Sequence, residues 1–259
     1  MKAMKERHDI GAAKEQADPD ATGGVAAVDR AFSIIAAIEG SDVPLGLSEL
    51  SRRTGLYKST ILRLMMSLER AGYIARLNEA RYGLGPTVWR LGHAYERSNP
   101  LKTHIEPILR QLVDGGTESA SFHVRNGPDS RLCLIRVDSH HSTLDHVRSG
   151  DVLPLKGAAG KILVEFANGR GPAGRDRIAI SYGERDPSCA GIATPVFGVG
   201  DHLLGALSLS GPRERFTEKK VASMRKLLLQ AAERASTALG GSSFAVSRAA
   251  RSTPVVRNP

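Results

Sequence analysis

The sequence predicts an α+β protein with two domains, and three observations support this prediction. Residues 25–85 show apolar side chains at helical spacing, whereas the period changes from helical towards two after Ser119. A length of 259 residues suits roughly two domains of ordinary size. Hydrophobic residues make up 41% and charged residues 24% of the chain, which is typical of a globular protein with a real core.

The first domain, over residues 25–85, is predicted to hold three helices followed by a hairpin. Gly40, Gly55 and Gly72 mark the points where the helical spacing stops. Ser48 is expected to cap the second helix, ahead of its acidic first turn. The helices are expected over residues 25–39, 48–54 and 57–71, and the strands over residues 73–77 and 81–84, with Asn78, Glu79 and Ala80 in the turn.

Two helices of this domain carry separate apolar and polar faces. The predicted buried stripe of the first helix consists of Val28, Ala31, Ile35 and Ile38. In the third helix, one sector of a helical wheel holds Ile61, Leu64, Met65 and Leu68, and another holds Ser59, Thr60, Arg63, Ser67 and Arg70. The apolar sector is expected to pack on the preceding helices, which leaves the polar sector facing solvent or a ligand.

The rest of the chain is predicted to form linker helices, a strand-rich domain and two tails. The linker, residues 86–115, holds helices over 87–98 and 101–113 that Asn99-Pro100 separates. The second domain, residues 116–240, has expected strands over 121–125, 132–138, 144–148, 191–197 and 203–210, and helices over 158–167 and 217–239. Residues 1–24 and 241–259 lack an apolar period and are expected to be disordered. For the basic C-terminal tail, a solvated terminus is favoured over a second DNA contact.

Charge and cysteine content restrict the class of protein. The formal net charge is +9, and residues 47–97 alone carry nine Arg or Lys against four Glu. Such an excess favours polyanions, either nucleic acid or an anionic membrane surface. Cys133 and Cys189 are too few for a disulfide framework or a cysteine zinc site. No membrane-spanning or signal segment is visible, so a reduced, cytoplasmic protein without a membrane partner is expected.

The polar sector of the third helix suits the major groove of double-stranded DNA, because a short helix pair can present such a face there. Arg63 can donate two hydrogen bonds to guanine O6 and N7. A plain surface helix has a similar face, but the basic excess, the turn glycine and the following hairpin favour DNA binding. The candidate DNA-binding residues are Arg52, Lys58, Ser59, Thr60, Arg63, Ser67, Arg76 and Arg81.

Small residues of the second domain form a candidate ligand site. Along residues 203–210, Ala206, Ser208 and Ser210 share one strand face, and the leucines between them share the other. The hydroxyls suit either a concave site or a water-facing strand, and alternation alone leaves both open. Residues 157–160 precede a helix, where backbone N–H groups suit an anion or simply form a structural turn.

No catalytic or metal-binding constellation stands out. Gly160-Lys161 fails as a phosphate loop, because Leu155 stands at the position of the first Gly and Ile162 at that of Ser or Thr. The serines of residues 203–210 lack the glycines of a nucleophile elbow. The one conceivable metal cluster consists of His123, His140, His141, His146, Asp138 and Asp145, and solvated or hydrogen-bonded histidines are favoured over it. We therefore expect no enzyme activity, no cofactor and no metal.

The runs VDRAFSIIAAIE, LSELSRRTGLYKSTILRLMMSLERAGYIAR and YGLG resemble the winged helix-turn-helix of the IclR family of bacterial transcriptional regulators. Further along, LPLKGAAGKILVEF, IATPVF and LLGALSLSGPRERF are similar to the effector-binding domain of that family, in the same order. The resemblance covers nearly all of residues 25–240. It departs in residues 166–188, which are shorter than usual, in the PLKGAAGK loop, and at Tyr57, where a proline is common.

The resemblance implies a winged N-terminal domain, a linker helix and a GAF-like C-terminal domain with a curved antiparallel sheet that binds a small metabolite, often a carboxylate or an aromatic acid. It also implies dimers, or dimers of dimers, on pseudo-palindromic operators. The ligand class does not transfer, because both shortened segments shape the pocket mouth. The implied ligand-binding residues are Ala158, Ala159, Gly160, Cys189, Gly191, Ser208 and Ser210.

The leading hypothesis is a ligand-responsive regulator, either a repressor or an activator, that binds operator DNA sequence-specifically as a homodimer or homotetramer. A metabolite bound in the second domain shifts the relative positions of the two DNA-reading helices of the dimer through residues 86–113. One alternative is an enzyme that a basic N-terminal module tethers to nucleic acid. Another is a chromatin-like protein that binds DNA without sequence preference.

Overall fold

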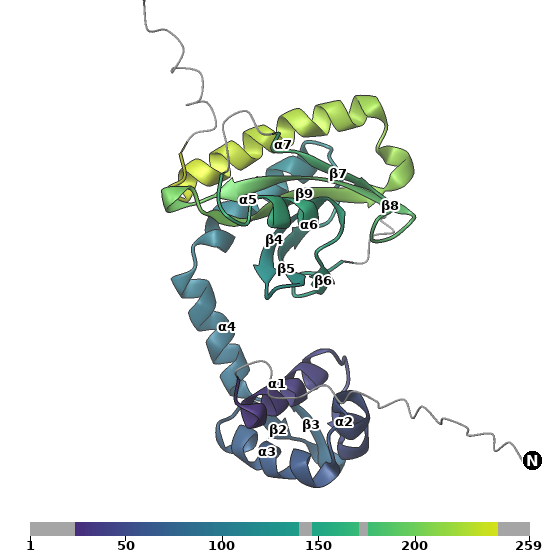
Figure 1. Ribbon diagram of the computed structural model, residues 1–259, viewed down its shortest axis with the longest axis vertical. Helices are drawn as coiled ribbons and strands as arrows, with labels where there is room; N and C mark the ends of the chain where they lie inside the picture. The colour runs from purple at the N-terminus through teal and green to yellow at the C-terminus, as the bar shows by residue number, and fades with distance from the viewer. Residues whose placement is uncertain (1–23, 140–146, 171–175, 243–259) are drawn as a thin grey trace, which may run out of the picture. The chain divides into compact units, whose positions relative to one another are not determined.

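The computed structural model describes residues 24–139, 147–170 and 176–242, and the chain divides into two compact units at Tyr95 and Glu96 (Figure 1). Most of both predicted tails and residues 144–146 of the strand expected over residues 144–148 lie outside the described residues. Residues 147 and 148 are described and belong to no strand, so that part of the prediction is wrong. The division falls within helix α4, Pro86–Ser98. Each unit has a hydrophobic core of its own, so each is described by itself.

The first unit contains the three helices and the hairpin that the sequence predicts. The helices are α1 (Ala26–Glu39), α2 (Leu47–Thr54) and α3 (Lys58–Arg70), and the strands are β1 (Leu45–Gly46), β2 (Ile74–Arg76) and β3 (Arg81–Leu84). The strands pair antiparallel in the order β1-β3-β2, and the expected turn is a short 3-10 helix over Asn78–Ala80. Gly55 takes the left-handed conformation, φ 71°, that the turn between α2 and α3 requires.

Two local predictions in this unit are wrong. Val28 is exposed, and Ile34 is fully buried together with Ile38. Since Val28 lies about 100° around the helix from the midpoint of Ile34 and Ile38, it falls outside the face that meets α2 and α3. Ser48 is not the N-cap of α2, because β1 pairs with β3 as far as Gly46 and the helix starts directly after it.

The second unit is a six-stranded antiparallel sheet in the order β6-β5-β4-β9-β8-β7. Its strands are β4 (Ser119–Asn126), β5 (Ser130–Val137), β6 (Val152–Pro154), β7 (Ala179–Tyr182), β8 (Cys189–Phe197) and β9 (Leu203–Pro212). Its helices are α5 (Leu101–Asp114), α6 (Gly157–Glu165) and α7 (Glu218–Ala238). Strands β6 and β7 were not predicted from the sequence, because they are short edge strands with few alternating positions.

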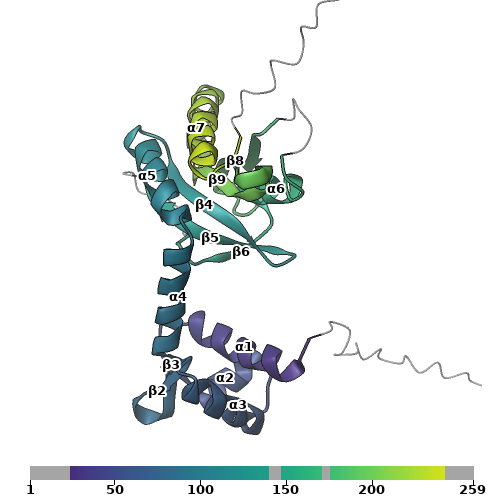
Figure 2. The same cartoon turned by 90° about the vertical axis from the view of Figure 1, so that its left-hand side faces the viewer.

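Helices cover both faces of this sheet, with α5 and α7 on one face and α6 on the other (Figure 2). Phe122, Leu207 and Leu209 pack with α5 and α7 in the main core. Ala206 instead packs in a smaller core with Phe166 and other residues on the α6 side. The alternation predicted along β9 is therefore confirmed, and it directs Ser208 and Ser210 to the same side as α6.

Candidate DNA-binding helix and ligand pocket

Helix α3 packs through the apolar sector that the sequence predicts. Ile61, Met65 and Leu68 are buried, and Leu64 is partly buried against the same core. Ser59, Arg63, Ser67 and Arg70 are exposed on the opposite side, whereas Thr60 is half-buried at its margin. The polar sector therefore faces away from the core of its own unit.

Two apolar residues share this exposed face and were missing from the predicted sector. Met66 is 64% exposed and lies between Leu62 and Ser59 around the helix, and Leu62 is also exposed. The predicted sector omitted them because it was defined by its polar residues alone. A helix that presents an unburied methionine among arginines and serines has an apolar contact to offer as well as hydrogen bonds.

The cations of α3 are not neutralised by neighbouring acids. Among the residues that the structure describes, the side chains of Lys58, Arg63 and Arg70 make no ion pair and no hydrogen bond. Arg52 differs, since its Nε and Nη2 donate to the two carboxylate oxygens of Glu49 at 2.8 and 2.6 Å. Hydrogen bonds from Arg52 and then Arg53 lower the pKa of the Glu49 carboxyl to about 2.

The two arginines predicted on the hairpin flank its tip. Arg76 ends β2 and Arg81 begins β3, and both are exposed. The guanidinium of Arg81 lies 3.5 Å from the carbonyl oxygen of Pro44, which directs this side chain towards β1. Both remain candidates for contact with a nucleic-acid backbone.

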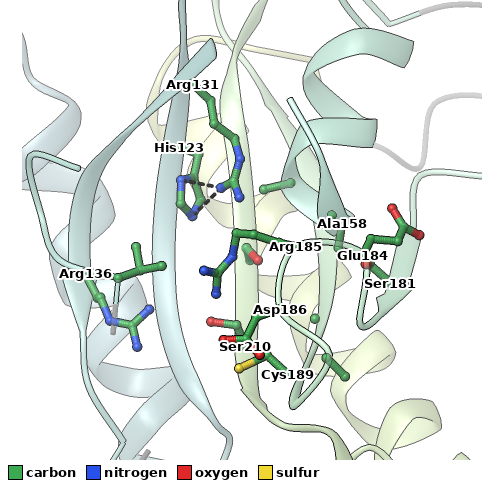
Figure 3. Close-up of a pocket in the computed structure, with 16 residues that line it drawn as sticks. His123, Arg131, Arg136, Ala158, Ser181, Glu184, Arg185, Asp186, Cys189 and Ser210 are labelled. Carbon is green, nitrogen blue, oxygen red and sulfur yellow. Dashed lines mark hydrogen bonds between the residues drawn. The ribbon is translucent and has the colours of Figure 1, made fainter. Parts of the chain in front are cut away.

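The second unit has a small pocket on the α6 side of its sheet, which opens to solvent (Figure 3). Six of the predicted ligand-binding residues line it: Ala158, Ala159, Cys189, Gly191, Ser208 and Ser210. Gly160 does not, because it packs on the preceding loop, where a Cβ would lie 2.4 Å from the carbonyl carbon of Leu155. The structure thus brings three separate segments to one site, and their binding role stays a prediction.

The hydroxyls of two largely buried serines face the cavity. Ser181 and Ser208 line it and are 5% and 4% exposed. Within the described ranges, neither hydroxyl has a hydrogen-bond partner. Ser181 Oγ lies near the start of α6, at 3.9 Å from where a Cβ on Gly157 would stand. Each hydroxyl can donate one hydrogen bond and accept others, so both are suited to a ligand in the cavity.

Sequence reasoning missed the charged part of the pocket. Arg131 and Arg136 from β5, His123 from β4, and Arg185 from the β7–β8 connection all line the cavity. Arg131 Nη1 lies 2.9 Å from His123 Nδ1, and His123 Nε2 lies 2.9 Å from Ser121 Oγ. Because a guanidinium only donates, these contacts fit a neutral ring that accepts at Nδ1 and donates from Nε2. Burial, followed by the charges of Arg131, Arg136 and Arg185, lowers the pKa of His123 well below its ordinary value.

A β-bulge places the two β5 arginines on the same face of the sheet. Phe122 pairs with Ile135 and His123 with Cys133, so Leu134 is an extra residue on β5. Without it, positions 131 and 136 would alternate to opposite faces. The available sequence signal was the presence of two arginines within the otherwise apolar run of residues 131–137.

An ion pair ties the β7–β8 connection to α6. Lys161 Nζ contacts the carboxylate of Glu184 and donates to the carbonyl oxygen of Ile180 at 3.1 Å. Lys161 is therefore a structural residue of the pocket mouth, in keeping with its rejection as a phosphate-loop lysine. The tie positions the neighbouring Arg185 over the cavity, where Figure 3 shows its guanidinium between the β4–β5 wall and α6.

Neither a metal centre nor a membrane span is found in the described part of the chain. Residues 24–139, 147–170 and 176–242 contain no group of three or more His, Cys, Asp or Glu side chains that could hold a metal ion. His140, His141, Asp145 and His146 lie outside the described residues. No described helix is both long and apolar enough to cross a membrane.

Comparison with known proteins assigns both units to one family. A family model described as the IclR helix-turn-helix domain matches residues 27–77, and another, described as the bacterial transcriptional regulator IclR C-terminal, matches residues 174–237. The chain is 26% identical to the HTH-type transcriptional regulator BhcR of Paracoccus denitrificans, with 82% of this chain and 86% of that protein covered. It is 23% identical to the transcriptional repressor IclR of Escherichia coli, with coverage of 85% and 92%.

Solved structures agree with the fold. An IclR-type regulator from Silicibacter matches with a TM-score of 0.69 and 24% identity, over 84% of this chain and 97% of that one. An IclR homologue from Microbacterium hydrocarbonoxydans, complexed with 4-hydroxybenzoate, matches with a TM-score of 0.66 and 19% identity, over 82% and 98%. The matched relatives are regulators rather than enzymes, which decides against the tethered-enzyme alternative. The chain belongs to the IclR family of transcriptional regulators, with an N-terminal helix-turn-helix DNA-binding domain and a C-terminal ligand-binding domain.

Proposed function

We propose that this regulator binds operator DNA sequence-specifically as a dimer or a dimer of dimers, and that a small organic acid in the second unit modulates this binding. The observation that carries the proposal is the exposed face of α3, whose cations make no ion pair within the described chain. A face of that kind can neutralise phosphates and still direct side chains to base edges. The regulator would act in the bacterial cytoplasm.

Roles can be distributed over this face from its geometry. Arg63 is in the middle of the exposed sector and is suited to bidentate contact with a guanine. Lys58 begins the helix and is suited to a phosphate, as are Arg52, Arg76 and Arg81 around it. Ser59, Thr60 and Ser67 supply hydroxyls for phosphates or base edges. Met66 is suited to the methyl group of a thymine.

Self-association is supported by helix α4, which has no buried residue. It carries large apolar side chains that are exposed in the single chain, including Trp89 and Tyr95. Such side chains on a surface helix are suited to a second copy of the same helix. Two copies of α3 related by a two-fold axis would contact DNA half-sites that are about one helical turn apart, or a multiple of it.

The effector is expected to occupy the pocket beside α6. Its arginines, its unbonded serine hydroxyls and the first turn of α6 all offer donors to an anionic group. The relative from Microbacterium hydrocarbonoxydans carries 4-hydroxybenzoate, an organic acid, which agrees with this expectation. Modulation requires that the acid bind the DNA-competent and incompetent arrangements with different affinity.

The test begins with selection of preferred sites from random DNA by the full-length protein, followed by fluorescence anisotropy on the selected site. Arg63→Ala should weaken binding by about 1–3 kcal/mol and relax the preference at one base pair. Lys58→Ala should weaken all sequences alike and reduce the slope of log affinity against log salt by about 0.9.

Arg125→Ala provides a matched control, because Arg125 is an exposed arginine of the second unit. It should leave the affinity, the base preference and the salt slope unchanged. If Arg63→Ala left discrimination between selected and random DNA intact, the assignment of α3 as the reading helix would be wrong. If the wild-type protein showed no preference at all, the chromatin-like alternative would replace the proposal.

A further inference from the structure

We propose that Tyr57 is a further positioning residue for DNA binding, and that its phenol hydroxyl donates a hydrogen bond to a backbone phosphate of the operator. This inference rests on the proposed function of α3 and adds a residue that is outside the candidate DNA-binding set. Tyr57 directly precedes α3, at the end of the turn that joins α2 to α3 (Figure 1).

The side chain of Tyr57 makes no polar contact within the fold. It is 83% exposed, which is the largest exposed fraction among the exposed large hydrophobic side chains of the described residues. Neither its hydroxyl nor its backbone N–H has a hydrogen-bond partner within residues 24–139, 147–170 and 176–242. A phenol combines an apolar ring with a polar hydroxyl, and both parts are free here to meet another molecule.

The backbone at Tyr57 is held in place by the turn before it. Ser51 Oγ donates to the carbonyl oxygen of Leu56 at 2.7 Å, and Leu56 N donates to Thr54 Oγ1 at 3.3 Å. Tyr57 itself takes φ −64° and ψ 141°, and its carbonyl oxygen accepts from Ile61 N at 3.0 Å. The phenol ring therefore extends from a fixed point, so that its ordering on DNA restricts little more than side-chain rotation.

The direction of Tyr57 around α3 points to the DNA backbone rather than to base edges. Each residue of an α-helix is turned by about 100° from the one before it, so Tyr57 lies about 120° around the axis from Arg63. Arg63 is in the middle of the exposed sector that is suited to base edges. A side chain so far from that direction meets the sugar-phosphate wall of the groove when Arg63 faces its floor.

The charges around Tyr57 favour a phosphate there. Lys58 follows it directly, and the first turn of α3 contains no acidic residue that would repel an anion. Phosphate oxygens are acceptors, and a phenol O–H is a donor that is commonly found on them. The hydroxyl is uncharged at neutral pH. Its contact should therefore add affinity without adding to the salt dependence of binding, unlike the contact of a lysine.

The test measures binding of the full-length protein to its selected site by fluorescence anisotropy over a range of salt concentrations. Tyr57→Phe removes only the hydroxyl and should weaken binding to selected and random DNA alike, by about tenfold, with an unchanged salt slope. Tyr57→Pro fits the observed φ and should weaken binding at least as much, while the thermal midpoint stays equal or rises. Tyr182→Phe, at an exposed tyrosine of β7, is the matched control and should change none of these quantities.

Neutral methylphosphonate groups, placed one at a time in the selected site, locate the contact. At the phosphate that accepts from Tyr57, the methylphosphonate and Tyr57→Phe should together weaken binding by less than the product of their separate effects. Independent effects at every phosphate would overturn the inference, as would wild-type affinity in Tyr57→Phe. A preference relaxed at one base pair by Tyr57→Phe would also overturn it, because the hydroxyl would then contact a base. If Arg63→Ala still lost discrimination in these cases, the proposed function would stand without the Tyr57 contact. A wild-type protein that bound no DNA would overturn both.

Discussion

His123 makes the stability of the second unit depend on pH in a way that the structure specifies. The ring is buried and neutral, with a pKa that burial and the nearby guanidiniums lower well below its ordinary value. In the unfolded chain the ring regains a pKa of about 6.5. Above about pH 6.5 the ring is neutral in both the folded and the unfolded chain, so the fold keeps its full stability. Below that pH the unfolded chain binds a proton that the folded chain does not, so the free energy of unfolding falls.

The size of the effect follows from proton uptake by the unfolded chain. Between pH 7.5 and 5.5 the ring becomes protonated in the unfolded chain while it stays neutral in the fold. This difference lowers the free energy of unfolding by about 1.4 kcal/mol. The groups that face the ring are Ser121, Arg131, Arg136 and Arg185. None of these arginines titrates in this range, so they hold the potential at the ring constant.

The assay is urea unfolding of the full chain at both pH values, with hydrogen exchange of β4 and β9 peptides to assign the transition to the second unit. From about pH 7.5 to 5.5, the free energy of unfolding of the wild-type protein should fall by about 1.4 kcal/mol more than that of His123→Gln. The comparison uses the change with pH within each protein, so a uniform destabilisation by the substitution does not affect it. Equal pH dependence in the two proteins would refute a buried neutral histidine.

Three further predictions concern packing and capping, and urea unfolding measures each. Gly160→Ala should lower the free energy of unfolding by about 1–3 kcal/mol, since the new Cβ would meet the backbone of Leu155 at 2.4 Å. Gly92→Ala in helix α4 is its control, because a Cβ there would meet nothing within 4 Å, and it should be neutral or stabilising. Leu109→Ala should cost about 2–5 kcal/mol, because this side chain is fully buried in the main core. Thr217→Ala should cost about 1 kcal/mol by removing the hydroxyl that accepts from Lys220 N, and Thr217→Ser should restore it.

The helix-turn-helix could be predicted in detail because its signals are local. Apolar spacing in α3, the left-handed Gly55 and the small hairpin each depend on a few consecutive residues. Where a helix begins at a strand that pairs with a distant segment, local signals fail. Leu45–Gly46 is too short to detect from alternation, and its pairing with β3 decides that α2 starts before Ser48.

The small residues of the pocket could be predicted and its charged residues could not, and for the two arginines of β5 a single inserted residue accounts for the difference. Ser208 and Ser210 follow the regular alternation of β9, so period-two reasoning placed them on one face. The same reasoning places Arg131 and Arg136 on opposite faces, because residues five positions apart, an odd step, point to opposite sides of a regular strand. The bulge at Leu134 reverses the alternation midway along β5, and only the pairing with β4 reveals it. The arrival of both arginines at one pocket therefore depends on strand register, which the residue pattern of β5 alone does not contain.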